Sequence, residues 1–319
     1  MSKKQKECVA AQRAAVVERI VSDMKEKEFG WVQTWSRCAA PVNAKTGDPY
    51  RGGNRLSLTI VSALLGYDDP RWVTFNQARE LGWWLFDNQH SQAVVEKWMP
   101  YSHRKEVEEA DEAEPEGLKP GNAAAKSGFA CVGCYKVFNA EQFKNAPALG
   151  VRERIVDDDG RLADELKASS RCPVSESPMD RVCYNPRTDK IYTPLRVQYE
   201  NNGAYLIDLL HEMGHSTGHE KALGRKLCGS FGSPEYAYEE LVAELCSAFC
   251  AQDLGVDAQA ARGRSFYDLH VGYLQHWTKR LSDDPDELYR AARQASRAAD
   301  YIIDRLGGQA EDAAITAVA

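Results

Sequence analysis

The sequence predicts an α+β protein of two domains, a small mixed-sheet domain flanked by helices and a mostly helical domain with a short sheet. Short strand-like runs occur in both halves of the chain, whereas the long apolar helical patterns lie in the second half. An acidic stretch at about 106–121, which ends in proline and glycine, separates the halves as an inserted, solvated loop. We therefore expect one domain over residues 1–147 and another over residues 148–319.

The first 29 residues have the pattern of a charged, amphipathic helix and not that of a signal peptide. No apolar run approaches the roughly 18 residues that a membrane helix needs. A content of 43% hydrophobic and 27% charged residues is typical of a globular protein. Nine cysteines at irregular spacing fit reduced thiols better than a disulfide framework. These features predict a cytoplasmic protein with no membrane contact.

Basic and aromatic residues gather in the first domain. Residues 1–105 contain 16 Lys plus Arg against 11 Asp plus Glu, a balance of +5, and the remainder has a balance of −12. Six of the seven tryptophans lie in this part, interleaved with arginines. Bases of single-stranded DNA stack on such rings while cations follow the phosphates, so the candidate DNA contacts are Trp35, Arg51, Arg55, Arg71 and Trp72. The same tryptophans are consistent with a hydrophobic core.

Two further motifs lie in the first domain. The segment Asp48–Asn54 is a predicted turn in which glycines let a backbone approach closely. Cys131 and Cys134 form a CxxC pair, but a structural metal site needs a second pair, and Cys172 and Cys183 have the wrong spacing. No helix-turn-helix or zinc-finger spacing is present, so sequence-specific reading of duplex DNA is not expected.

Two short runs are predicted strands. Residues 135–139 resume the fold after the acidic stretch, and residues 190–195 form a short strand in the second domain. Pro194 favours an edge position, because proline donates no hydrogen bond to a neighbouring strand. An exposed edge binds an extended peptide by strand addition.

The most informative motif is His211-Glu212-Met213-Gly214-His215. The apolar run at 204–210 predicts a buried helix, and Gly218 is its expected stop. Residues four apart on a helix share one face, so both imidazoles can bind one metal ion while Glu212 points at its open side. The alternative is a buried helix whose histidines are only hydrogen bonded.

A catalytic zinc ion takes three protein ligands and keeps a fourth position for water. His219 lies roughly 12 Å along the axis from His211 if the helix continues, so it reaches the site only if the helix breaks at Gly218. Another class of zinc peptidases places a third histidine six residues after the second. That position is Lys221 here, which excludes this class.

A second helical pattern at 236–253 supplies carboxylates. Glu240 and Glu244 lie within or beside its apolar stripe, and a carboxylate on a buried face is costly unless it is paired or binds metal. We expect Glu240 to be the third ligand and Glu244 to accept a hydrogen bond from the far nitrogen of a ligating histidine. Glu239 is expected to point toward solvent. The alternative is an ordinary acidic helix with its charges outward.

These parts predict a zinc site, with manganese or cobalt as substitutes, bound by His211, His215 and Glu240. Zinc lowers the pKa of its bound water toward about 7, and Glu212 is expected to act as the general base when that water attacks a carbonyl. The residue that stabilises the oxyanion stays open among five downstream side chains: Tyr236, Tyr238, His270, Tyr273 and His276.

Motifs in both halves resemble ArdC-type antirestriction proteins, over the region from about Phe29 to about Leu306. In the first domain they are Trp35, Pro41-x-Asn43, Tyr50–Asn54, Pro70–Ala78 and Lys136–Asn139. In the second domain they are Tyr184–Pro186, Ile191–Pro194, His211–His219, Phe231–Ser233 and Tyr236–Glu244. The chain departs from the family after Trp83, where residues 85–92 replace a lysine-containing, glycine-rich turn.

The resemblance implies a protein of plasmids or other mobile elements, with an N-terminal domain that binds single-stranded DNA and a C-terminal zincin. Its implied role is to protect incoming DNA from restriction during conjugation. Two alternatives remain: a DNA-binding protector whose metal site is structural or inactive, and an intracellular peptidase whose N-terminal domain recognises protein. Metal-dependent proteolysis separates the first alternative from the main interpretation, and binding of single strands separates the second.

Overall fold

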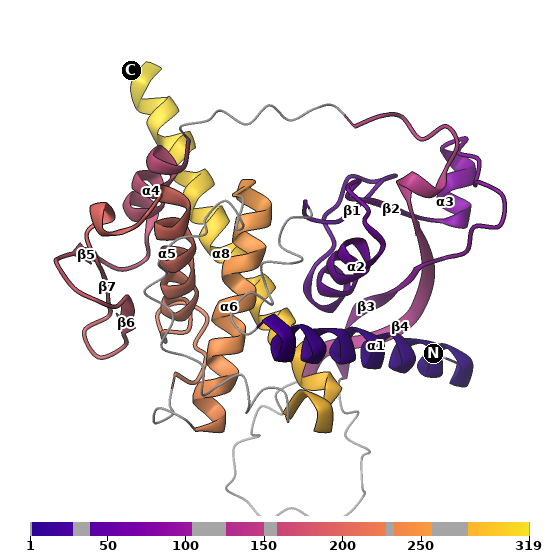
Figure 1. Ribbon diagram of the computed structural model, residues 1–319, viewed down its shortest axis with the longest axis horizontal. Coiled ribbons are helices and arrows are strands. Elements are labelled where there is room, and N and C mark those ends of the chain that lie inside the picture. Colours follow the sequence, from indigo (N-terminus) through magenta and orange to yellow (C-terminus); the bar gives the residue numbers. More distant parts are fainter. Residues whose placement is uncertain are drawn as a thin grey trace, which may run out of the picture.

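The computed structural model describes six stretches of the chain, which are residues 2–27, 39–103, 126–149, 158–227, 233–256 and 280–318. They form a mixed α+β fold, as predicted, with a sheet in the N-terminal half and a mostly helical C-terminal half. The sheet lies beside the helices of the C-terminal half (Figure 1), and the last helix contacts helices of both halves. None of the described helices is long and apolar enough to cross a membrane.

The N-terminal half contains a four-stranded sheet in the order β1-β2-β4-β3. Its strands are β1 (Val42–Asn43), β2 (Arg71–Thr74), β3 (Ala93–His103) and β4 (Lys126–Asn139). The pair β1 and β2 is parallel and the other neighbours are antiparallel, so the sheet is mixed, as predicted. The run predicted as a strand at 135–139 is the end of the longer β4. The pairing of β3 with β4 is irregular between Lys97 and Trp98.

Three helices accompany this sheet: α1 (Lys3–Lys27), α2 (Gly52–Leu65) and α3 (Phe75–Glu80). The start of α3 is fixed locally, because the Thr74 hydroxyl accepts a hydrogen bond from the backbone N–H of Gln77 and the Gln77 side chain accepts one from that of Thr74. A short 3-10 helix, η2 (Ala140–Gln142), follows β4 and is capped in the same way by Asn139.

The C-terminal half is built from helices with one small sheet. Its elements are α4 (Asp158–Ser169), β5 (Val174–Glu176), β6 (Cys183–Asn185), β7 (Lys190–Thr193), η3 (Arg196–Gln198), α5 (Asn202–Ser216), α6 (Pro234–Leu254) and α8 (Pro285–Val318). The sheet order is β5-β7-β6, so the edge position predicted for residues 190–195 is wrong. Pro194 follows the last residue of β7 and therefore removes no hydrogen bond from the sheet. The strand at the edge nearest α5 is β6.

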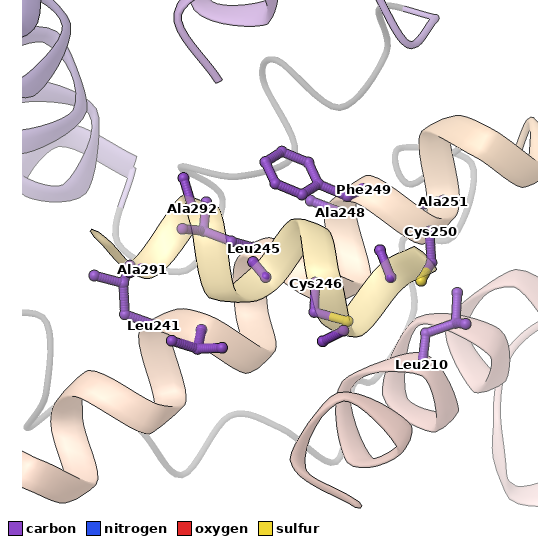
Figure 2. Close-up of a cluster of buried hydrophobic side chains, with 14 of the residues drawn as sticks. Leu210, Leu241, Leu245, Cys246, Ala248, Phe249, Cys250, Ala251, Ala291 and Ala292 are labelled. Carbon is purple, nitrogen blue, oxygen red and sulfur yellow. The ribbon is translucent and has the colours of Figure 1, made fainter. Parts of the chain in front are cut away.

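Helices α5, α6 and α8 enclose the main hydrophobic core. Figure 2 shows Leu245 and Phe249 of α6, Leu210 of α5 and the alanines Ala291 and Ala292 of α8, which all belong to this cluster. Small residues set the spacing of α5 and α6: a Cβ added to Gly214 would lie 3.4 Å from the Cα of Ala243. This close approach brings the carboxylates of α6 up to the histidines of α5.

The same core continues into the N-terminal half. Val16 and Ile20 of α1 and Leu56 and Ile60 of α2 belong to the cluster that contains α5, α6 and α8. Residues from both sides of position 147 therefore exclude water together. The division at residues 147 and 148 remains a prediction about the chain's organisation, and the hydrophobic core does not follow it.

Gly53 permits the contact between α2 and α8. A Cβ at this position would lie 2.4 Å from Cδ1 of Tyr289, whose ring is buried and whose hydroxyl is 2.8 Å from the Ser57 hydroxyl. We expect Gly53→Ala to lower the free energy of unfolding by about 1–3 kcal/mol, because the ring cannot move aside without breaking this contact. Urea unfolding measures the loss. Gly307→Ala is the matched control, since Gly307 is also helical and a Cβ there meets no atom within 4 Å; equal stabilities of the two variants would contradict the prediction.

Candidate metal centre

Helix α5 places both histidines of the motif on one buried face. The Asn201 side chain accepts a hydrogen bond from the backbone N–H of Ala204 at 2.9 Å and fixes the start of the helix. The helix then runs without interruption to Ser216. The Nε2 atoms of His211 and His215 lie 3.0 Å apart. The predicted helix and the shared face of the two imidazoles are therefore present.

Glu240 of α6 completes a cluster with the two imidazoles. Its Oε2 lies 3.5 Å from Nε2 of His211, and its Oε1 lies 3.5 Å from Nε2 of His215. One ligand atom from each residue lies within 4.8 Å of the others, which makes this the one group of three or more potential metal ligands found among the described residues. We call it the His–His–Glu cluster. Two imidazole nitrogens and one carboxylate are a donor set of catalytic zinc sites, so the residues fit a metal ion.

The other nitrogen of each imidazole faces a carboxylate of α6. Glu244 Oε2 lies 3.4 Å from Nδ1 of His211, the position expected for it. Glu239 Oε1 lies 3.5 Å from Nδ1 of His215, and the guanidinium of Arg225 donates to both Glu239 oxygens, at 2.6 and 3.1 Å. Glu239 is 8% exposed, so its predicted solvent position is wrong. Arg225 also donates to the backbone oxygen of Gly214, which ties this pair to α5.

His219 is not part of the cluster. Its Nε2 lies 3.8 Å from Oδ2 of Asp189, and its Nδ1 accepts a hydrogen bond from the backbone N–H of Lys221. The helix ends before it, with Gly218 N–H bonded to the backbone oxygen of His215. The structure thus gives the third position to Glu240.

The cluster has an electrostatic preference for a positive charge. Burial opposes protonation of His211, but Glu240 and Glu244 outweigh it and raise the pKa of this imidazole to about 9. Burial alone would raise the pKa of Glu240, but His215 and His211 hold it well below its usual value. A buried site that stabilises extra positive charge in this way also favours a metal cation, which takes the place of the protons.

Glu212 lies beside the cluster in a cavity of about 150 Å³. Its Oε2 accepts a hydrogen bond from the backbone N–H of Tyr184 in β6, at 2.5 Å. Burial raises the pKa of Glu212 above its usual value. The cavity lies between β6 and the start of α6, and it reaches Cys183 and Tyr236. A carboxylate with a raised pKa next to a metal position is placed to exchange protons.

Sequence reasoning missed the polar network that holds β6. The Tyr184 hydroxyl donates to Asp189 Oδ1 at 2.8 Å, and the guanidinium of Arg171 binds both Tyr184 and Asp189. The hydrogen bond from Arg171 holds the pKa of Asp189 at about 2. The one signal for this network in the sequence was the Tyr184–Pro186 motif, which belongs to the family resemblance. The network fixes the strand whose backbone binds Glu212.

Of the five side chains considered for oxyanion stabilisation, Tyr236 lines the cavity of the cluster. Tyr238 does not line it, and its hydroxyl accepts a hydrogen bond from Gln294 at 3.2 Å. His270, Tyr273 and His276 lie outside the described residues.

Two of the predicted DNA contacts are internal. Trp72 is 0% exposed and packs between the sheet and α2 with Leu58 and Val137. Arg55 is 4% exposed, and its guanidinium donates to the side chain of Gln252 and the backbone oxygen of Phe249 in α6. These side chains cannot meet a base or a phosphate on the surface, so both predictions are corrected: the residues belong to the interior that joins the two halves.

The remaining predicted contacts differ in accessibility. The Arg51 side chain is 58% exposed and pairs with Asp300 of α8. The Arg71 side chain is 17% exposed, pairs with Asp69 at 2.6 Å and lies over the ring of Trp83. Trp35 and the acidic insertion at about 106–121 lie outside the described residues. Arg51 is thus the most exposed of the described candidates.

The contact of Glu239 with His215 predicts an effect on metal affinity. We expect Glu239→Gln to weaken metal binding about 10–100-fold, because the imidazole loses the carboxylate that orients its ring and supports its basicity. Equilibrium dialysis against Zn²⁺ measures the change. Glu220→Gln, an exposed position beyond the end of α5 that does not line the cavity of the cluster, is the control. Equal affinities for the two variants would remove this role from Glu239.

Comparisons with known protein families match the two halves separately. The N-terminal domain of anti-restriction factor ArdC matches residues 10–138. A zincin-like metallopeptidase domain matches residues 161–294, which contain the whole His–His–Glu cluster.

Similar proteins cover most of this chain. It is 30% identical to a DNA primase TraC of Escherichia coli in an alignment of 299 residues, which covers 90% of this chain and 19% of the primase. A second TraC is 31% identical over 26% of its own length, so the chain spans about a fifth to a quarter of these relatives. An uncharacterized protein y4eC of Sinorhizobium fredii is 28% identical, with 93% of this chain and 90% of that protein covered.

Two crystal structures of the antirestriction ArdC protein from plasmid R388 are similar to this chain. The metal-free structure has a TM-score of 0.67 at 25% identity, with 93% of this chain and 98% of that chain covered. The Mn(II)-bound structure has the same TM-score at 26% identity, with 92% and 97% covered. The similarity therefore extends across both halves.

Proposed function

Because this chain belongs to the ArdC antirestriction family, with the N-terminal domain of ArdC followed by a zincin-like metallopeptidase domain, we propose that it protects incoming mobile-element DNA from host restriction. In this proposal it binds single-stranded DNA and cleaves a protein substrate at a metal-dependent peptidase site. The observation that carries the proposal is the convergence of His211, His215 and Glu240 beside the buried carboxylate of Glu212. The expected compartment is the cytoplasm.

The proposed cofactor is one zinc ion, with manganese or cobalt as substitutes. His211, His215 and Glu240 would hold it, and the bound ion would supply Lewis acidity and a water of lowered pKa. A solved ArdC structure holds Mn(II), which supports manganese as a substitute. Glu239 and Glu244 would keep the two imidazoles in the tautomer that leaves Nε2 free for the metal.

Glu212 is the proposed general base. Its contact with the backbone of Tyr184 fixes the carboxylate, and burial raises its proton affinity. The strand that bounds the cavity is β6, which pairs with β7 on one side only within the described sheet. We propose that its free edge binds an extended peptide by strand addition, which would carry the scissile carbonyl past Glu212.

One observation favours an alternative for the N-terminal half. Trp72 and Arg55 are buried, so two of the side chains expected to contact DNA do not reach the surface. This burial favours the alternative in which the N-terminal half recognises protein. Titration of the full chain with single-stranded and duplex oligonucleotides at several salt concentrations decides between these functions. Preference for the single strand with strong salt dependence supports DNA binding, and equal affinity for both forms supports protein recognition.

A proteomic comparison of recipient cells tests the peptidase. Cells that receive the wild-type protein should lose, or show shortened forms of, particular host proteins that remain intact with Glu212→Gln. Identical proteomes would favour the alternative of a DNA-binding protector whose metal site is structural or inactive.

A further inference from the structure

A cavity of about 760 Å³ lies where the N-terminal half meets α8. We call it the α2–α8 cavity. It is bounded by the start of α2, by β3 and by one face of α8, and the residues that matter here are Arg51, Gly52, Trp98, Arg293, Ser296 and Arg297. It is distinct from the cavity of the His–His–Glu cluster, with which it shares no lining residue.

Two arginines of α8 give this cavity uncompensated positive charge. Arg293 and Arg297 are exposed and lie four residues apart, on one face of the helix. Other arginines at the cavity are paired: Arg51 with Asp300, and Arg13 with Glu96 at 2.7 Å. Within the described part of the chain, no carboxylate pairs with Arg293 or Arg297. Their guanidinium groups are therefore available for an anion.

An aromatic ring lies against one of these arginines. The guanidinium carbon of Arg293 is 4.8 Å from the centre of the Trp98 ring, and Trp98 is 39% exposed. Trp98 follows the irregular pairing of β3 with β4. A planar cation stacked on a partly exposed indole forms a flat surface on which a nucleobase can stack.

The start of α2 adds to the positive potential. Arg51 precedes the helix and supplies no side-chain acceptor for its first turn, which also contains no acidic residue. The backbone N–H of Gly52 donates to the Ser296 hydroxyl at 2.7 Å, so the end of α2 is held directly against α8. The positive end of a helix dipole favours phosphate, and here it opens on the same cavity as the two arginines.

We propose that the α2–α8 cavity binds single-stranded DNA, with Arg293 and Arg297 on backbone phosphates and a base on Trp98. This inference rests on the proposed DNA-binding function and places half of the DNA site on the metallopeptidase half of the chain. Arginine forks match phosphate geometry, and a single strand exposes the base faces that a duplex hides. The bound strand thereby contacts both halves of the protein at once.

The test uses the full-length protein and a fluorescein-labelled oligothymidylate, with anisotropy read at several salt concentrations. We expect Arg293→Gln and Arg297→Gln each to weaken binding about tenfold at low salt. Each should also make the log–log salt dependence shallower by about 0.7, the value for one phosphate contact on a single strand. Trp98→Leu should weaken binding about fivefold or more without changing the salt slope, because stacking releases no counterion.

Arg290→Gln is the matched control. Arg290 lies one turn before Arg293 on the same helix, pairs with Asp284 and does not line the α2–α8 cavity. Its variant should bind like the wild type, and thermal unfolding should show that all variants are folded. If the wild type binds the oligonucleotide and the Arg293→Gln/Arg297→Gln double variant binds equally well, the cavity is excluded while DNA binding stands. If the wild type does not bind at all, both the cavity and the DNA-binding function fail.

Discussion

Glu212→Gln is expected to slow metal-dependent peptide hydrolysis about 10²–10⁴-fold while leaving the metal bound. The expected size of this rate decrease is that for the loss of a positioned general base. Metal retention follows from the geometry, since Glu212 is outside the His–His–Glu cluster and contacts the backbone of Tyr184. Glutamine keeps the shape and an acceptor oxygen for that contact but cannot take a proton. The Glu212→Gln substitution therefore distinguishes loss of the hydrolytic step from loss of metal binding.

His215→Ala is the contrasting variant, because it removes a nitrogen of the cluster and should abolish metal binding and hydrolysis together. Metal content by plasma mass spectrometry and hydrolysis of unfolded casein by the zinc-loaded full chain measure the two effects. Loss of metal from Glu212→Gln would make this residue a ligand. Undiminished hydrolysis by Glu212→Gln would place the base elsewhere. Metal retained in Glu240→Ala would reassign the third position to Glu239, Glu244 or His219.

Arg55→Ala is expected to lower the free energy of unfolding by about 3–5 kcal/mol, a large part of the stability of a typical domain. The guanidinium is buried and satisfies the Gln252 side chain, the Phe249 backbone oxygen and Asp253. Its removal leaves the buried Gln252 side-chain oxygen without this donor and takes the charge partner from Asp253. It also opens a void against the Phe249 ring, which lies 4.5 Å from the guanidinium carbon.

Urea unfolding of the full chain measures this loss. Arg51→Ala is the control, because Arg51 is also at the start of α2 but pairs with Asp300 on the surface, where an ion pair contributes little. A loss below about 1 kcal/mol in Arg55→Ala, together with weaker DNA binding by the folded variant, would restore the original interpretation of Arg55 as a DNA contact.

The metal cluster was predictable because its geometry is local. A spacing of four on α5 places His211 and His215 together, and a carboxylate within the apolar stripe of α6 needs a cation, which identifies Glu240. The burial of Glu239 was not predictable, because its partner Arg225 approaches from a connection that has no periodic pattern. The central position of β7 depends on pairing with β5, which the residues of β7 themselves do not encode.

The tryptophans show a different limit. Composition predicts that aromatic rings gather in the N-terminal half, but it cannot say which of them the sheet covers. Trp72 faces α2 and is enclosed, whereas Trp98, which is 39% exposed and follows the irregularity within the β3–β4 pairing, was not singled out. Side-chain exposure is settled by long-range packing, and no local pattern reports it.

The continuous core has a consequence for how such a protein can be inherited. A recombination breakpoint between residues 147 and 148 would leave Val16, Ile20 and Leu56 on one product and the facing surface of α6 and α8 on the other. Each product would expose a hydrophobic surface that chaperones and proteases recognise. A new partner domain would bury that surface only if its own packing surface were complementary. Recombination between genes is therefore expected to transfer the coding regions of both halves together. Breakpoints that give a folded product are expected outside the region that encodes this shared core.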